Sequence, residues 1–114
     1  MSDRARIISV IPVYNGERFI RAALDSLAAQ TLRPDRVIVL DDASTDGTSQ
    51  LVETYKPLDC ELIRSEKNEG LFKNFNQALT YATECDFLHY ICADDVLLPG
   101  FMERMTAALT DAPA

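Results

Sequence analysis

Cysteine and histidine, the residues that most often bind zinc or take part in redox chemistry, are scarce in this sequence. Its 114 residues include three cysteines and one histidine. The cysteines, Cys60, Cys85 and Cys92, are odd in number and lack Cys-x-x-Cys spacing, which argues against disulfides and a zinc site and favours reduced, mostly buried thiols. His89 lies inside an apolar run, where a packing role is favoured over catalysis.

Basic stretches, long apolar runs and an apolar leader are also missing. The 11 lysines and arginines are outnumbered by 18 aspartates and glutamates, and the net charge of −7 argues against a nucleic-acid backbone as the partner. An anionic ligand therefore needs a metal ion or local hydrogen-bond donors. The apolar runs are far shorter than a membrane span, and residues 1–6 lack the hydrophobic stretch of a signal peptide. We therefore expect a cytoplasmic protein without a transmembrane segment.

Two glycine-rich nucleotide-binding motifs do not occur. The sequence has only four glycines, and they form neither Gly-x-Gly-x-x-Gly after the first predicted strand nor the Walker lysine motif. Dinucleotide reductases and P-loop enzymes are thereby disfavoured. The remaining composition, 47% hydrophobic and 25% charged residues, is ordinary for a globular protein. The length fits a single domain, residues 1–114.

Strand and helix patterns alternate along the chain. Apolar, β-branched runs predict strands over residues 6–13, 36–40 and 60–64 and from residue 87 onward. Apolar residues at helical spacing predict helices over residues 17–30 and 71–83, a short helix after residue 48 and a last one from residue 101. This alternation predicts an α/β layered domain with a mainly parallel sheet. Pro12 is expected to take the end of the first strand out of the ladder.

Polar side chains follow three of the predicted strands. They are Tyr14 and Asn15, Asp41 and Asp42, and Asp94 and Asp95. Because ligands bind at the edge where the carboxyl ends of parallel strands meet, we expect these residues to converge. Two carboxylates about 4 Å apart repel by roughly 4 kcal/mol at an effective dielectric near 20. Mg²⁺ or Mn²⁺ would supply the compensating charge; the alternative is that Asp94 and Asp95 are solvated turn residues.

Some of these groups suit a nucleobase. The Tyr14 ring could stack on a base, and Asp41 or Asp42 could accept a hydrogen bond from a base N–H such as N3–H of uracil. The alternatives are an ordinary half-buried aromatic for Tyr14 and turn-making or helix-capping for Asp41, Asp42 and Asp46. The run from Asp42 to Glu53 also has the spacing of an EF-hand calcium loop, but a β-branched run precedes it where a helix is required.

Four short motifs follow one another along the chain. They are Ser9-Val10-Ile11-Pro12-Val13-Tyr14-Asn15, Val39-Leu40-Asp41-Asp42-Ala43-Ser44-Thr45-Asp46-Gly47-Thr48, Asn68-x-Gly70 with Asn76 downstream, and Ala93-Asp94-Asp95. In this order and at these separations they resemble the amino-terminal half of glycosyltransferase family 2 enzymes. The resemblance covers residues 7–105 and implies a GT-A fold, a Rossmann-like three-layer α/β sandwich, truncated after the DXD-type motif.

The resemblance implies roles for the matching residues. By this similarity Pro12, Tyr14 and Asp42 line the base pocket. Asp94 and Asp95 are the variable DXD element that holds Mg²⁺ or Mn²⁺ on the sugar-nucleotide diphosphate, with Asp95 the direct ligand. Further residues that the resemblance implies in substrate binding are Asn15, Asp41, Asn68, Gly70 and Asn76.

The sequence departs from the family pattern in three respects. Cys92 stands where an aspartate is common, and Asn74 stands where a small residue is usual. The larger departure is length, because family members continue with an acceptor-binding half that includes the catalytic base. No catalytic residue is therefore assigned in this chain.

The implied activity is inverting, metal-dependent transfer of a sugar from a nucleotide-diphosphate-sugar, with UDP favoured, to a glycan or lipid-linked acceptor in polysaccharide biosynthesis. Without a base, the chain alone is expected to bind the donor and transfer little or nothing. We also expect peripheral association of the full-length enzyme with the inner face of the membrane, and self-association through the strand at Phe87 as an exposed edge. The alternatives are a non-catalytic nucleotide-sugar-binding module and a receiver-like or phosphatase-like acidic metal site.

Overall fold

Strands and helices alternate in the computed structural model, which describes residues 5–111. The strands are β1 (Ile7–Val13), β2 (Arg36–Asp41), β3 (Cys60–Arg64) and β4 (Phe87–Tyr90). The helices are α1 (Ile20–Ala28), α2 (Thr48–Glu53), α3 (Leu71–Leu79), the 3₁₀ helix η1 (Thr80–Glu84) and α4 (Phe101–Asp111). The predicted elements are confirmed with shifted ends: α1 is shorter than the helix predicted over residues 17–30, and the one predicted over 71–83 continues as η1 after Leu79.

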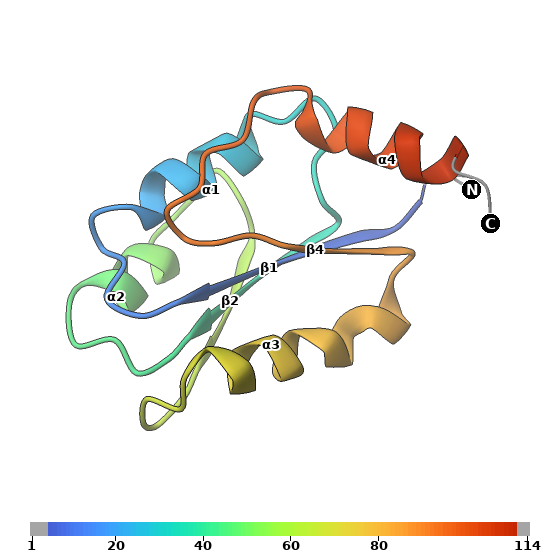
Figure 1. The fold of residues 1–114 in the computed structure, drawn as a ribbon. Coiled ribbons are helices and arrows are strands. Elements are labelled where there is room, and N and C mark those ends of the chain that lie inside the picture. Colours follow the sequence, from blue (N-terminus) through green and yellow to red (C-terminus); the bar gives the residue numbers. More distant parts are fainter. Residues whose placement is uncertain (1–4, 112–114) are drawn as a thin grey trace.

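The four strands form one parallel sheet in the order β3-β2-β1-β4. All seven residues of β1 are buried, as expected for a central strand covered on both faces. Figure 1 shows α1 and α4 over one face of the sheet and α3 over the other. The predicted three-layer α/β architecture is therefore confirmed.

The core has two parts because strand side chains alternate between the two faces of the sheet. On the face covered by α1, Ile11 and Val13 pack with residues of β2 and with Leu24 of α1. On the opposite face, Ile8 and Val10 pack with Ala78 of α3. The residues of α3 that turn toward the sheet are Asn74 and Ala78, while Leu71, Phe72 and Phe75 stay 75%, 90% and 45% exposed.

Pro12 remains in the sheet, so the prediction that the first strand leaves the ladder there is wrong on the β2 side. Pairing with β2 continues to Val13, opposite Asp41. On the other side, pairing with β4 ends at Val10, and the last bond there runs from Ile91 N to the Val10 carbonyl. Because backbone groups alternate between neighbouring strands, the Pro12 nitrogen faces the side where β4 has already ended.

β4 forms an edge of the sheet among residues 5–111, since β1 is the one strand with which it pairs there. An edge strand presents unpaired backbone groups to other chains. Self-association through this edge stays a prediction, which sizing chromatography at high protein concentration tests. None of the helices in the described residues has the length and apolar character needed to cross a bilayer.

His89 joins β4 to its neighbours, β1 and α4. Its Nδ1 lies 3.0 Å from the Ser9 hydroxyl of β1, and its ring packs against Phe101 at the start of α4, 5.7 Å between ring centroids. Burial lowers the pKa of His89 below its ordinary value of 6.5. The packing role predicted for this residue is therefore supported.

We expect the free energy of unfolding to fall as the pH drops below about 6.5, the pKa of histidine in the unfolded chain. In that range the unfolded chain binds a proton at residue 89 that the folded chain does not, and this favours unfolding; above it, both states carry a neutral ring. Urea denaturation between pH 5 and pH 8 measures the effect, with His89→Gln as the comparison. An identical pH profile for the variant would contradict the assignment.

Candidate functional site

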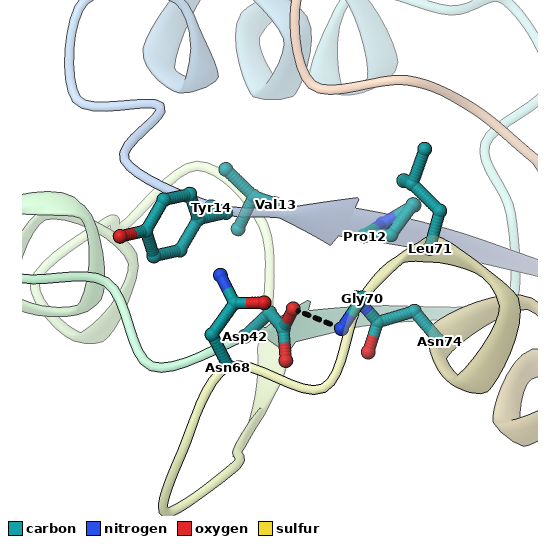
Figure 2. A pocket seen from close by; sticks show the side chains of 8 residues that line it. All are labelled: Pro12, Val13, Tyr14, Asp42, Asn68, Gly70, Leu71 and Asn74. Atoms are coloured by element: carbon teal, nitrogen blue, oxygen red, sulfur yellow. Dashed lines mark hydrogen bonds between the residues drawn. The ribbon is translucent and has the colours of Figure 1, made fainter.

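Two adjoining hollows lie at the carboxyl ends of β1 and β2. The first, the Asp42 pocket, has a volume of about 220 Å³ and is lined by Pro12, Val13, Tyr14, Asp42, Asn68, Gly70, Leu71 and Asn74 (Figure 2). The second, the Asp94 hollow, also measures about 220 Å³ and is lined by Pro12, Val13, Tyr14, Asn15, Gly16, Phe19, Ala93 and Asp94. The two share Pro12, Val13 and Tyr14, so they adjoin at the end of β1.

Tyr14 lines both hollows. The residue is 50% exposed, directly after the fully buried run of β1. A half-exposed ring at the rim of a pocket keeps one face free for stacking on a flat ligand. The exposure also fits the plain alternative of a half-buried aromatic, so the stacking role of Tyr14 stays a prediction.

Asp42 holds the loop that forms the far wall of the pocket. One carboxylate oxygen accepts the Glu69 N–H at 2.8 Å and the other accepts the Gly70 N–H at 2.9 Å, and the residue is only 2% exposed. The second of these bonds is drawn in Figure 2. The loop also needs Gly70 itself, whose φ of 90° lies in the region that glycine tolerates. The wall of the pocket therefore depends on a carboxylate at residue 42.

Asn15 ties the turn after β1 to the loop after β2. Its side-chain oxygen accepts the N–H groups of Thr45 at 2.8 Å and Asp46 at 3.3 Å, and its own N–H donates to the Ser44 hydroxyl at 2.8 Å. Asn15 can do this because its φ of 50° is left-handed, a conformation that asparagine tolerates. In this structure Asn15 shapes the Asp94 hollow, and its contact with substrate stays a prediction.

Asp46 supports the same loop. Its carboxylate accepts N–H groups from Thr48 at 3.0 Å and Glu17 at 3.2 Å. Burial acts to raise the pKa of Asp46, but the hydrogen bonds from Thr48 and Glu17 outweigh it and the pKa is lowered. The turn-making role considered for Asp46 accounts for these bonds. β2 precedes this loop, so the helix that an EF-hand requires is not there.

Asp41 lines neither hollow. It is 1% exposed, its Oδ1 accepts the Ser44 N–H at 3.0 Å, and its Oδ2 lies 3.5 Å from the Arg64 guanidinium. Arg64 also donates to the Ser44 carbonyl at 2.6 Å. Asp41 therefore stabilises the loop after β2 within the described structure, and its predicted contact with substrate is left without support from the geometry.

Other predicted residues divide between the site and its surroundings. Asn68 and Gly70 line the Asp42 pocket, whereas Asn76 is exposed on α3 and lines neither hollow. Asn74 lines the pocket although the sequence analysis assigned it no role. The signal for it was available in the spacing, because a residue four positions after Gly70 on a helix faces back toward that loop.

A cluster of possible metal ligands adjoins the Asp94 hollow. Ligand atoms of Cys92, Asp94 and Asp95 all lie within 4.8 Å of one another, and all three residues are exposed. The exposure of Cys92 makes the prediction of buried thiols wrong for that residue; Cys60 and Cys85 are partly buried and also free. Burial and the charges of Asp95 and Asp94 raise the pKa of the Cys92 thiol, which keeps it neutral at pH 7. The two carboxylates thus fit a hard cation such as Mg²⁺ or Mn²⁺.

Comparison with known proteins gives a consistent result. The sequence pattern described as "Glycosyl transferase family 2" matches residues 9–114. Poly(ribitol-phosphate) beta-N-acetylglucosaminyltransferase TarS of Staphylococcus aureus is 38% identical over 92 residues, which cover 77% of this chain and 16% of TarS.

Solved structures share the fold. A crystal structure of S. aureus TarS 1-349 in complex with UDP-GlcNAc superposes with a TM-score of 0.83 at 33% identity, covering 93% of this chain and 31% of that one. The mannosyltransferase PcManGT of Pyrobaculum calidifontis, in complex with GDP-Man and Mn²⁺, superposes with a TM-score of 0.75 at 31% identity, covering 92% of this chain and 32% of that one.

The curated relatives are longer than this chain, which spans 16–48% of their length. The matched region nevertheless includes almost all of the described residues, with both hollows and the acidic cluster. The parallel sheet order and the four motifs agree with that match. The chain belongs to glycosyltransferase family 2.

Proposed function

We propose that this chain is the donor-binding part of an inverting, metal-dependent glycosyltransferase that uses a nucleotide-diphosphate-sugar, with UDP favoured, and a glycan or lipid-linked acceptor. The observation that carries the proposal is the pair of adjoining hollows at the end of β1, the Asp42 pocket and the Asp94 hollow, which share Tyr14 in their lining. A base in the pocket and a diphosphate in the hollow would place the phosphates next to two carboxylates. The relatives crystallised with UDP-GlcNAc or with GDP-Man and Mn²⁺ support the same class of ligand.

The proposed roles follow the positions of the side chains. Tyr14 stacks on the base, Asp42 holds the pocket wall and accepts a base N–H, and Asn68 and Gly70 close the pocket. Asp94 and Asp95 hold Mg²⁺ or Mn²⁺. When bound, the cation neutralises the diphosphate of the donor and of the leaving group.

The acidic cluster also explains why a cation is needed. The chain carries a net charge of −7, and a nucleotide diphosphate is itself an anion. Asp94 and Asp95 beside a bare diphosphate would repel it, whereas a divalent ion between them turns the repulsion into attraction. We propose a cytoplasmic location at the inner face of the membrane for the full-length enzyme, on the resemblance to its family alone.

Isothermal titration of the chain with UDP, GDP and dTDP, each with and without Mn²⁺, tests this function. We expect saturable binding of UDP that becomes at least tenfold tighter with Mn²⁺, a gain of about 1.4 kcal/mol. Absence of binding by all three nucleotides in the presence of Mn²⁺ would refute the proposal. Equal affinity with and without Mn²⁺ would refute the role of the acidic cluster.

A second experiment separates binding from transfer. We expect the 114-residue chain to bind a UDP-sugar and yet to release no more than one equivalent of UDP, because no base has been assigned to take the proton of the acceptor hydroxyl. A radiolabelled-donor assay with Mn²⁺ and a simple glycan acceptor measures this, with TarS as the active control. Multiple turnovers by this chain alone would contradict the prediction.

A further inference from the structure

Asn74 is a buried residue whose side-chain amide has no hydrogen-bond partner among the described residues. The residue is 4% exposed in the first turns of α3, and its side chain makes no hydrogen bond to another residue between 5 and 111. No side-chain nitrogen or oxygen in that range is both fully enclosed and unpaired. The polar atoms of Asn74 must therefore reach the small opening left to the residue, and that opening is the Asp42 pocket, which it lines.

The direction of the side chain agrees with this. Figure 2 shows Asn74 extending from α3 toward Gly70, on the side of the pocket where Asp42 lies. The helix holds it there, because Asn74 N–H donates to the Gly70 carbonyl at 3.3 Å. The amide is held by a helix, makes no hydrogen bond within the described residues and opens on the pocket, so its polar atoms are available to a ligand there.

The other polar groups of the pocket are less available. Asp42 already uses both oxygens on the Glu69 and Gly70 N–H groups, and a carboxylate can accept but never donate. Asn68 is exposed, so water competes for its amide. Asn74 is thus the enclosed side chain of the pocket that offers an N–H donor.

We propose that Asn74 determines which nucleobase the pocket accepts, an inference that rests on the proposed nucleotide site. The Asn74 amide donates to a base carbonyl oxygen, while a remaining lone pair of Asp42 accepts the ring N–H beside that carbonyl. Uracil, thymine and guanine present this adjacent pair. Cytosine and adenine present a bare ring nitrogen there, which would face the Asp42 carboxylate without a proton between them.

The test compares two alanine variants for binding of UDP, GDP and CDP in the presence of Mn²⁺. The wild-type chain is expected to bind UDP or GDP at least tenfold more tightly than CDP. Asn74→Ala is expected to bind the preferred nucleotide about tenfold more weakly than the wild type does. The ratio of its affinities for that nucleotide and for CDP is expected to fall to about threefold or less. The matched control is Gln77→Ala, which removes an amide from the same helix outside both hollows and is expected to keep the wild-type preference.

A purely structural role for Asn74 predicts a different pattern. In that case Asn74→Ala would lower the thermal midpoint of unfolding and reduce the affinity for all three nucleotides equally. Our inference predicts an unchanged midpoint, because the substitution removes no hydrogen bond within the described chain. Asn74→Asp provides a second test. Because it exchanges the donor for an acceptor, it should weaken the binding of UDP and GDP at least as much as Asn74→Ala does. Wild-type affinity and preference in Asn74→Ala would overturn this inference alone, and a wild-type chain that binds no nucleotide would overturn it together with the proposed function.

Discussion

Replacing Asp42 with alanine is expected to weaken UDP binding by about a hundredfold and to lower the free energy of unfolding by about 2 kcal/mol. The carboxylate holds two backbone N–H groups of the pocket wall, at Glu69 and Gly70. Without it these N–H groups form hydrogen bonds to water instead. The segment that carries Asn68 and Gly70 is then less ordered, and ordering it each time a ligand binds reduces the affinity. The variant also loses the acceptor proposed for the base N–H.

Two further variants make this result specific. Asp42→Asn keeps the shape of the side chain and one acceptor oxygen, so we expect an intermediate loss of affinity. Asp59→Ala removes an exposed carboxylate that lines neither hollow, and it should bind UDP as the wild type does. Calorimetric titration gives the affinities and urea denaturation the stabilities. Binding within twofold of the wild type in Asp42→Ala would show that the pocket wall does not depend on this carboxylate.

Replacing Asp95 with alanine is expected to abolish the part of UDP binding that depends on Mn²⁺, a loss of at least tenfold in affinity when the metal is present. Asp94 and Asp95 are the carboxylates of the exposed cluster, and the neutral Cys92 thiol beside them is a poor ligand for a hard cation. With one carboxylate left, the ion loses a charged ligand and much of its attraction to the site.

The measurement is the affinity for UDP with Mn²⁺ and with a chelator in place of the metal. For Asp95→Ala the two values should coincide, while the chelator should still weaken the wild type and Asp59→Ala. Cys92→Asp provides the opposite change, since a third carboxylate in the cluster, where the Cys92 sulfur now stands, should tighten Mn²⁺ binding. A metal-dependent gain that survives in Asp95→Ala would assign the ion to other ligands.

The layered sheet was predictable because its signals are local. β1 and β2 are apolar runs buried on both faces, and such runs have no other stable place in a small domain. Which side of α3 faces the sheet was harder to predict from the sequence. Its apolar residues predict a helix correctly, yet the side turned to the sheet carries Asn74 and Ala78, and Phe75 remains partly exposed against Tyr90. Sequence spacing specifies a stripe, whereas the neighbouring strands decide which edge of the stripe is covered.

Asp41 and Asp42 show that the sequence also gives limited information about the site. Neighbouring residues at a strand end point in opposite directions, so only one member of Asp41 and Asp42 can face a given pocket. The sequence presents both equally, and the structure separates them: Asp41 meets Arg64, and Asp42 meets the loop at Gly70. Bonds between segments far apart in the chain, such as Asn15 to Thr45, leave no trace in local spacing.

The proline in β1 gives the site its opening. Beyond the pair Val10 and Tyr90, the next rung between β1 and β4 would run from the nitrogen of residue 12 to the Ile91 carbonyl. The proline nitrogen carries no hydrogen to donate, so this hydrogen bond between the two strands cannot form. Pairing between β1 and β4 therefore stops short of Pro12, which lines both hollows, and a flat ligand can bind there without breaking hydrogen bonds between these two strands.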